Sequence, residues 1–415
     1  MTPRRSIIPV FIPHLGCPCR CVFCNQNSIT SVDDCKVACS KNDKNSGNAC
    51  HGDLTLSGIG ITKGMPMPSE IGSIIEDGIS KAGKGAELAF YGGSFTAIHP
   101  SLMRSYLEAA YPYVSGGLIG SIRISTRPDA IDNEILCRLR YYGVRTIELG
   151  AQSMDDRVLK LSKRGHTAAD TERAAKLIRR MGFSLILQMM VGLPGETPGS
   201  PMTTAHRIAD LEPDGVRIYP TAVIRGTELE QMWKSGEYTP LSFDQAVEIC
   251  ADLVGFFDSK GISVLRVGLN PSEDLSGEIA AGIYHPAFGD YCKSRLVYRA
   301  ARQLLSGVIG TGRIRDGGTA LFGVERRHLS LFVGQHRQNI NKLMEEFGLE
   351  GISVFDREAL SVTNYKRRGG STGKIYSFAS SEGFDEILSG KEMIPAKKST
   401  ITAGSQVLVE FLGIY

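Results

Sequence analysis

The sequence predicts an α/β fold: a partial or complete β/α (TIM-like) barrel followed by a smaller α+β domain. Short apolar runs alternate with segments of helical period from the N-terminus to about residue 267. The runs are apolar at successive positions, as strands buried on both faces of a parallel sheet are. Near residue 290 this alternation stops. We therefore expect the barrel over residues 1–290 and the α+β domain over residues 291–415.

Seven apolar runs are the expected barrel strands. They cover residues 7–12, 87–91, 121–126, 145–149, 184–191, 215–219 and 262–267. Two helices between them have readable ends: 167–181 begins at Thr167, and 242–260 begins at Ser242 with Gln245 as its capping-box partner. Active sites of β/α barrels lie at the carboxyl ends of the strands, so that edge is where we look for functional residues.

The second domain shows a weaker pattern. We expect helices at 292–305 and 335–346, a strand at 328–333 between them, and a final strand in the run SQVLVEFLG. Within 31–65 the sequence is polar and rich in Gly and Asn, which indicates an inserted surface loop. Cys35, Cys39, Cys50 and His51 in this loop either bind a second metal or are tolerated thiols, and their spacing matches no known zinc pattern.

The composition fits a cytoplasmic enzyme. The net charge of +3 implies no strong polyanion field, and the ten cysteines are not spread like a disulfide framework. No apolar stretch reaches the roughly 18 residues of a membrane span. The N-terminal run reads as a first strand and not as a signal peptide.

The segment from Cys17 to Cys24 carries the strongest chemical signal. Cys17, Cys21 and Cys24 have the spacing C-x3-C-x2-C, and Cys19 is an additional thiol. Three thiolates on one short loop can hold three irons of a 4Fe–4S cluster and leave the fourth iron open. A structural zinc site is the alternative, and it usually takes four ligands in two close pairs.

This loop resembles that of the radical S-adenosylmethionine (SAM) superfamily, in which the open iron binds SAM through its amine and carboxylate. Phe23, just before the last cysteine, fits the same pattern. The resemblance implies that Gly92, Gly93 and Ser94 hold the SAM amino group, because glycines let the backbone approach a ligand. It also implies that Ser125 bonds a ribose hydroxyl and Arg127 reaches a carboxylate, although a helix cap with an ordinary salt bridge would look alike.

Further residues at the expected strand ends complete the predicted site. The cofactor-binding candidates there are Gln152, Arg164 and Gln188. The three catalytic candidates are His166, Tyr219 and Arg225, and each has a structural alternative. His166 either touches substrate or SAM, or caps a helix. Tyr219 either stacks a base or relays a hydrogen atom, or is a buried structural residue, and Arg225 either holds a phosphate or pairs with Glu228.

The sequence is also similar to the radical SAM half of the elongator catalytic subunit family, which modifies the wobble uridine of tRNA. Thr126–Asp129, Arg164–Thr167 and the run VRIYPTAVIRGTEL at 216–229 carry this similarity. Two departures matter: the cysteine spacing is tighter than in that family, and nothing after residue 290 resembles its acetyltransferase domain. The resemblance implies reductive cleavage of SAM to a 5′-deoxyadenosyl radical that abstracts hydrogen from a substrate, with a reductant such as ferredoxin or flavodoxin and tRNA as partners.

Two other functions remain open. An oxygen-independent coproporphyrinogen oxidase-like enzyme shares the cysteine spacing and would need a ring of arginines in its cavity. A non-catalytic Fe–S protein that binds RNA would leave the glycine and Thr-Arg-Pro-Asp motifs without a purpose. The sequence does not identify the substrate.

One motif of the C-terminal domain also points to RNA. The polar turn Gly334-Gln335-His336-Arg337 is similar to the nucleic-acid-binding G-x-x-G turn of KH domains, with Arg337 in place of the second glycine. Basic residues surround it in the sequence: Arg326, Arg327, His328, Lys366, Arg367 and Arg368. They either bind phosphates with steep salt dependence or form a solvated rim.

Overall fold

The computed structural model describes residues 6–12, 17, 21–24, 65–269, 277–309, 318–356, 360–366, 372–378, 394–402 and 408–414, with side-chain environments as far as residue 356. The predictions made for Cys19, Cys35, Cys39, Cys50, His51, Arg367 and Arg368 lie outside these residues. In the described part of the chain no helix is long and apolar enough to cross a membrane.

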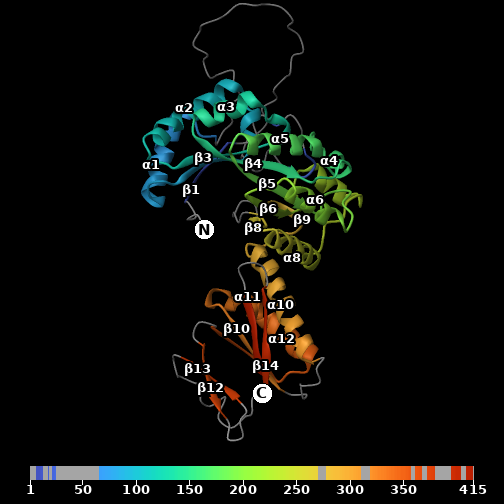
Figure 1. Cartoon of the computed structure of the whole chain (residues 1–415). Coiled ribbons are helices and arrows are strands. Elements are labelled where there is room, and N and C mark those ends of the chain that lie inside the picture. The colour runs from blue at the N-terminus through green and yellow to red at the C-terminus, as the bar shows by residue number, and fades with distance from the viewer. Residues whose placement is uncertain are drawn as a thin grey trace, which may run out of the picture. The chain divides into compact units, whose positions relative to one another are not determined.

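A curled seven-stranded sheet forms the first part of the chain (Figure 1). Its strand order is β1-β2-β3-β4-β5-β6-β8. The strands are β1 (Ile7–Phe11), β2 (Glu87–Tyr91), β3 (Ser121–Thr126), β4 (Val144–Gln152), β5 (Ser184–Val191), β6 (Gly215–Pro220) and β8 (Ser263–Val267). The pairs from β1 to β6 are parallel, so their carboxyl ends meet at one edge. The predicted strands and the predicted half-barrel architecture are confirmed.

The strands form because their side chains are buried on both faces. In β5, Leu185, Leu187 and Val191 on one face are 0% exposed, and Ile186 and Met190 on the other are 4% and 9% exposed. β-Branched and other bulky apolar residues fill such positions well.

Helices follow the strands and cover the outer side of the curled sheet (Figure 1). They are α1 (Ile71–Ala82), α2 (Pro100–Ser115), α3 (Asn133–Tyr141), α4 (Asp156–Leu161), α5 (Ala168–Arg180) and α6 (Ser200–Ala209). The predicted helix at 167–181 is α5, whose N-cap Thr167 forms a capping box with Asp170. After β6 come β7 (Ala222–Ile224) and α7 (Glu228–Lys234), and β7 pairs with β9 (Ile279–Gly282).

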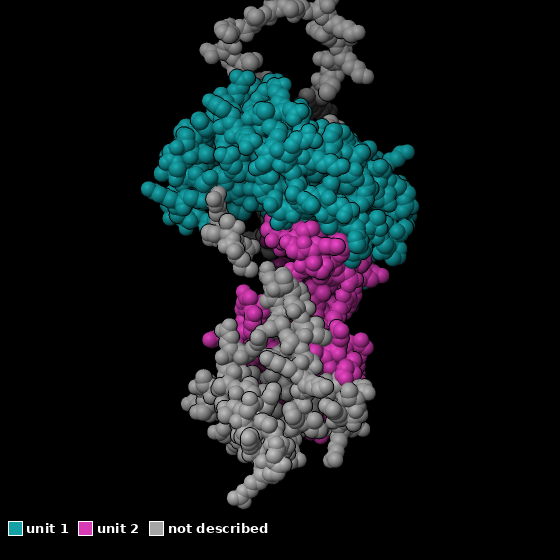
Figure 2. All heavy atoms as spheres, in the orientation of Figure 1, with its two compact units in different colours: residues 1–242, 269–284 teal, residues 243–268, 285–415 magenta. Residues whose placement is uncertain are grey.

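Internal contacts divide the chain into two compact units, coloured in Figure 2. Unit 1 comprises residues 1–242 and 269–284, and unit 2 comprises 243–268 and 285–415. Unit 2 begins with α8 (Phe243–Ser259), the helix predicted at 242–260.

Unit 2 contains a four-stranded sheet of order β11-β10-β15-β14. Its elements are α10 (Phe288–Ile309), β10 (Thr319–Val324), α11 (Leu329–Val333), α12 (Gln338–Phe347), β11 (Gly351–Asp356), β14 (Ile394–Thr402) and β15 (Leu408–Ile414), with a separate hairpin of β12 (Leu360–Lys366) and β13 (Thr372–Phe378). The core joins α10 to the sheet through side chains such as Leu305, Phe322 and Leu343, each 0% exposed.

The strand predicted at 328–333 is wrong, because residues Leu329–Val333 form helix α11. The run Leu-Ser-Leu-Phe-Val is too short for its apolar period to distinguish a strand from a buried helical turn. The helix ends at Gly334, whose φ of 74° is a conformation that glycine adopts readily. The turn that follows therefore joins two helices, α11 and α12.

Candidate functional site

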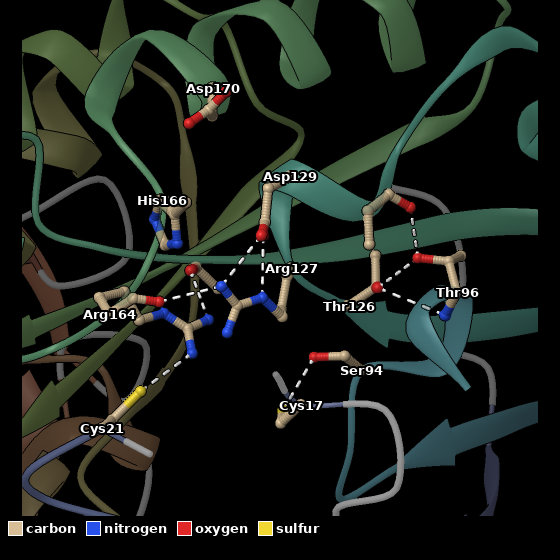
Figure 3. Close-up of polar contacts among 12 residues, drawn as sticks. Cys17, Cys21, Ser94, Thr96, Thr126, Arg127, Asp129, Arg164, His166 and Asp170 are labelled. Atoms are coloured by element: carbon tan, nitrogen blue, oxygen red, sulfur yellow. Dashed lines mark hydrogen bonds and ion pairs between the residues drawn. The ribbon is translucent and has the colours of Figure 1, made fainter. Parts of the chain in front are cut away.

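Three thiols of the N-terminal loop share one environment at the strand ends of unit 1. The Cys17 Sγ lies 3.3 Å from the Ser94 Oγ, and Arg164 Nη1 donates to the Cys21 Sγ at 3.5 Å (Figure 3). Burial, together with the neighbouring Cys21 and Cys17, raises the pKa of Cys24 to about 12, and the Arg164 charge opposes this. The three cysteines that the spacing singles out are therefore close enough to influence one another.

The backbone of this loop is held by two distant segments. Val22 N–H donates to the Ser162 carbonyl at 3.1 Å, and Leu229 N–H donates to the Val22 carbonyl at 2.8 Å. Between them, Phe23 packs against two buried clusters, one of Val158, Met190 and Leu193 and the other containing Val223 and Leu229. These contacts explain why an aromatic residue precedes the last cysteine.

The run at 216–229 builds the platform for this docking. It forms β6, β7 and the start of α7, whose N-cap Thr227 accepts from Glu230 N–H and donates to the Ile224 carbonyl at 2.6 Å. Predicted site residue Arg225 precedes this cap, and its N–H donates to the Glu278 carbonyl at 2.8 Å. Tyr219 lies on β6 and packs against the same Met190 and Leu193 cluster as Phe23 does. The most distinctive part of the sequence thus supports the cysteine loop.

The glycine motif after β2 places its backbone tightly against β1. Gly92 has a φ of 100°, and a Cβ there would lie 2.7 Å from the Ile12 carbonyl oxygen. Thr96 then fastens the turn to the end of β3, because its Oγ1 lies 2.6 Å from the Thr126 Oγ1 and donates to the Ala130 carbonyl (Figure 3). Gly92, Gly93 and Ser94 are therefore held near Cys17 by a rigid turn.

Arg127 supports Arg164 in this structure. Its guanidinium pairs with Asp129 through Nε at 2.8 Å and donates through Nη2 to the Arg164 carbonyl at 3.0 Å (Figure 3). Only 1% of Arg127 is exposed. Arg164 in turn donates to the Gly150 carbonyl at 2.9 Å as well as to Cys21. The two arginines form a chain from Asp129 to the cysteine loop.

His166 lies on the same segment and is neutral at physiological pH. Burial, and then the Arg164 charge, lower its pKa to about 4. Its Nε2 lies 3.2 Å from the Ala151 carbonyl oxygen, and its buried Nδ1 has no partner among the described residues. A buried nitrogen without a partner is costly, so it marks a place where a ligand atom would be stabilised.

Ser125, Gln152 and Gln188 follow one another across β3, β4 and β5. Gln188 Nε2 donates to the Gln152 Oε1 at 3.3 Å, and Gln152 has a φ of 64° next to a register shift in β4. Positive φ at a non-glycine residue is uncommon and concentrates at ligand sites. Gly92, Gly93, Ser94, Ser125 and Gln152 thus lie at or just after the carboxyl ends of β2, β3 and β4. Gln188 lies within β5, Arg164 follows α4, and Phe23 belongs to the cysteine loop.

Sequence reasoning missed a charged network on one face of the sheet. Arg123 bonds both Glu87 and Glu148, and Arg217 bonds Glu148 at 2.9 Å. The signal was present, because a charged residue stands at a core position in SIRIST, RTIEL and GVRIY. Each arginine is already neutralised by a carboxylate, so this network does not offer free cations for a substrate with several carboxylates.

Glu196 is a second residue without a sequence assignment. It accepts from Gly192 N–H at 2.7 Å in the turn after β5. Burial raises its pKa to about 7, against the effect of backbone hydrogen bonds from Gly192 and Leu193. Tyr238 donates to the Gly192 carbonyl at 2.6 Å, so both groups fix this turn.

The cysteine loop fits an iron–sulfur cluster better than a mononuclear metal in its donor chemistry. Among the described residues no group of three or more His, Cys, Asp or Glu surrounds one metal-ion position. A cubane differs from such a site because each thiolate binds its own iron. Three mutually influencing thiols with a guanidinium beside one of them suit an anionic cluster, since donors to the cysteine sulfur stabilise it.

Comparisons with known proteins identify the family of the chain. The sequence matches the Radical SAM superfamily over residues 11–208 and the Radical_SAM C-terminal domain over residues 213–298. It is 31% identical over 187 residues to the tRNA uridine(34) acetyltransferase of Dehalococcoides mccartyi, a match covering 40% of this chain and 41% of that protein. It is 35% identical over 136 residues to human Elongator complex protein 3, covering 32% of this chain and 25% of that protein.

Among solved structures, the archaeal Elp3 of Methanocaldococcus infernus with an N-terminal deletion aligns with a TM-score of 0.47 and 22% identity, covering 75% of this chain and 70% of that one. The matches to the two curated relatives span less than half of those proteins' lengths.

Proposed function

This chain belongs to the radical SAM superfamily, and on that premise we propose that it is a radical SAM enzyme that modifies tRNA. Enzymes of this superfamily use a 4Fe–4S cluster and SAM, which supply a 5′-deoxyadenosyl radical able to remove hydrogen from an unactivated carbon. The observation that carries the tRNA proposal is the 31% identity to a tRNA uridine(34) acetyltransferase over 187 residues.

We assign the cluster to Cys17, Cys21 and Cys24. Supporting this, the three thiols influence one another, and the loop that bears them is fixed through Val22 and Phe23. Arg164 stabilises the negative charge on Cys21, and Arg127 positions Arg164. Both arginines can act in these roles from their present positions in the fold.

For SAM we assign the strand-end residues around this loop. Gly92 and Gly93 present backbone to the amino group, and Ser94, Ser125, Gln152 and Gln188 supply hydrogen-bonding groups. His166 accepts or donates through its unpartnered Nδ1, and it does so as a neutral imidazole. Tyr219 and Arg225 face the substrate in this proposal, since both lie on the segment that carries β6 and β7.

The acetyl-transfer step of the relatives is not part of the proposal. The match covers only 41% of the Dehalococcoides mccartyi protein, and the C-terminal domain proposed for residues 291–415 has no sequence resemblance to an acetyltransferase. A coproporphyrinogen oxidase-like function is less well supported, because Arg123 and Arg217 are both paired with Glu148. We place the enzyme in the cytoplasm with a ferredoxin or flavodoxin as reductant.

The test is anaerobic reconstitution of the full chain, followed by incubation with SAM, dithionite and total tRNA. We expect 5′-deoxyadenosine, and a mass change in one tRNA nucleoside that depends on the enzyme. The Cys24→Ala variant under the same conditions is the control for chemistry that is independent of the cluster. Formation of 5′-deoxyadenosine without any change in tRNA nucleosides would refute the tRNA substrate and leave the enzyme class standing.

A further inference from the structure

The turn between α11 and α12, here called the Gly334 turn, consists of Gly334, Gln335, His336 and Arg337. All but the first of these residues are exposed. His336 and Arg337 have φ values of 50° and 62°, so two consecutive non-glycine residues are left-handed. Such residues cost about 1–3 kcal/mol each and persist only where the surroundings hold them.

The buried side chain of Asn339 fixes the conformation of the turn. It is 7% exposed, and its Nδ2 lies within hydrogen-bond distance of the Ser294 Oγ at 2.9 Å and of the carbonyls of Leu331 and Phe332 at 3.1 Å. Gly334 packs directly on it, since a Cβ at Gly334 would lie 3.0 Å from the Asn339 Cγ. Asn339 thus ties the end of α11 and the start of α12 to α10. The turn is pre-organised, and its outer surface is left for a ligand.

Cations without a carboxylate partner belong to the turn and to the segments next to it. Arg337 is part of the turn, Lys293 lines the cavity beside it, and Arg326 begins the segment that leads into α11; all three are exposed, and none forms an ion pair within the described part of unit 2. Other arginines of the same unit behave differently, because Arg295, Arg299 and Arg302 are each neutralised by a carboxylate. The N-terminus of α12 adds a positive end of a helix dipole without a side-chain cap. This face of the unit therefore attracts phosphate groups.

A cavity of about 370 Å³ opens beside the turn and is lined by Gly334, Gln335 and Lys293. His328 also lines it, is only 8% exposed, and keeps its Nδ1 without a hydrogen-bond partner, the nearest carboxylate oxygen being 3.6 Å away on Glu325. Its other lining groups are mixed and include apolar Val254 and Leu331, the aromatic ring of Tyr291, the carboxylates of Asp258 and Asp290, and the guanidinium of Arg327, which pairs with Glu325.

The mixed lining distinguishes the cavity from a plain anion site. The carboxylates of Asp258 and Asp290 balance the charges of Lys293 and Arg327 in this lining, so the cavity offers no excess positive charge to a phosphate. A nucleobase offers both donors and acceptors and an apolar face, which suits such a lining. Recognition of individual RNA bases usually targets unpaired ones, because side chains cannot read the deep, narrow major groove of an RNA duplex. A phosphate on the turn and a base in the cavity are the two parts of one nucleotide within a strand.

We propose that the Gly334 turn and the adjoining cavity bind a single-stranded segment of RNA, with the phosphodiester backbone on the turn and an unpaired base in the cavity. This inference rests on the proposed tRNA substrate and names the part of the chain that would hold that RNA outside the catalytic unit.

The binding test uses the full reconstituted chain and fluorescence anisotropy with a labelled single-stranded RNA of about 12 nucleotides, the same sequence as a duplex, and tRNA. The variant Arg326→Gln/Arg337→Asn removes two cations, and asparagine tolerates the left-handed backbone at 337. We expect roughly 10-fold weaker binding of single-stranded RNA and a shallower salt dependence, by about 0.7 per lost phosphate contact. The control Lys260→Gln/Arg302→Gln removes the same charge away from the turn and should bind as the parent does.

A second variant, His328→Phe, keeps the ring volume in the cavity and removes both nitrogens. It should weaken single-stranded RNA several-fold and leave the salt dependence unchanged, because no phosphate contact is lost. Tighter binding of the duplex than of the single strand would overturn the base-in-cavity assignment. Displacement of the strand by free uridine monophosphate at equal concentration would show a mononucleotide site and overturn the RNA assignment.

The outcomes separate this inference from the proposed function. If Arg326→Gln/Arg337→Asn binds RNA like the parent, the RNA site lies elsewhere and the tRNA proposal survives. If the parent binds neither tRNA nor single-stranded RNA, both proposals fail together. Cleavage of SAM by both variants at the parental rate confirms that the catalytic unit is intact.

Discussion

Arg164 donates to the sulfur of Cys21 while its own backbone carbonyl accepts a hydrogen bond from Arg127. The loop bearing the cysteines is thus connected electrostatically to a segment that follows β4, well over a hundred residues later in the chain. The connection predicts that Arg164 tunes the cluster that we assign to this loop.

Removing the Arg164 charge should make the cluster harder to reduce. An electron added next to a guanidinium is stabilised by it, so Arg164→Met should shift the reduction potential to a more negative value. Arg164→Lys keeps the charge and should restore most of the shift. Potentiometric titration followed by electron paramagnetic resonance measures both, and the exposed Arg173→Gln is the matched control. An unchanged potential in Arg164→Met would separate Arg164 from the cluster.

The cysteine assignment predicts a simple pattern of iron content. Cys17→Ala, Cys21→Ala and Cys24→Ala should each lose most of the roughly four irons of the parent chain, because a cubane needs all three thiolates. Cys19→Ala should keep them. Iron analysis and visible absorbance after anaerobic reconstitution give the result. Loss of iron from Cys19→Ala with retention in Cys21→Ala would exchange the two assignments.

Gly92→Ala should impair both stability and SAM binding. Its φ of 100° and the 2.7 Å approach to the Ile12 carbonyl leave no room for a Cβ. Gly83 is a useful comparison, because its φ is 81° but no atom lies within 4 Å of its added Cβ. Gly83→Ala should therefore cost about 1–3 kcal/mol from backbone strain alone, and Gly92→Ala more. Urea unfolding and equilibrium dialysis with SAM would compare them; equal effects of the two variants would contradict the role of the close approach.

Glu196 should make stability fall as pH rises through neutrality. Its pKa is about 7 in the folded chain against the model-compound value of 4.5, so the folded state binds the proton more tightly than the unfolded state. The stabilisation is full below pH 4.5 and is lost as pH rises from there to 7. Glu196→Gln removes this dependence, so it should melt higher than the parent at pH 8 and about equally at pH 4.5. Melting curves at both values test it, and parallel profiles would show that Glu196 ionises normally.

Thr227→Ala should weaken the anchoring of the cysteine loop, although Thr227 is not part of that loop. Losing the N-cap of α7 costs about 1 kcal/mol, and α7 provides the Leu229 N–H that holds the Val22 carbonyl. We expect faster loss of iron to a chelator, with Thr227→Ser close to the parent because its hydroxyl still caps the helix. Chelation kinetics measure the effect, and equal rates for Thr227→Ala and the parent would mean that the loop does not depend on α7.

The sheet could be predicted because its strands are buried on both faces, and continuous apolar runs such as SLILQMMV are typical of strands in parallel sheets. The helical conformation of α11 could not be predicted, since a run of five residues carries too little period to separate a turn of helix from a strand. Glycine at 334 was visible in the sequence as a stop signal, but it stops either element equally well.

Some residues of the candidate site could also be predicted from the sequence, and others could not. The cysteines and glycines were recognisable because their spacing and backbone freedom belong to the chain itself. The contacts of Arg127 were not, because whether its guanidinium meets Asp129 or a ligand depends on how β3 and the Arg164 segment pack. Charged residues at core positions of the strands signalled that Arg123 and Glu148 have buried partners, but the identity of those partners was not recognisable. Arg123, Glu87 and Glu148 lie on different strands, and only the sheet register brings them together.

The two hydrogen bonds of Val22 have a consequence for biosynthesis. The Val22 carbonyl accepts a hydrogen bond from Leu229 N–H, and Leu229 leaves the ribosome long after the cysteines do. While the chain is being made, the three thiols are on a loop whose final anchor does not yet exist, and they stand open to oxidation. The iron delivery machinery therefore meets its finished binding loop only after most of unit 1 has been synthesised.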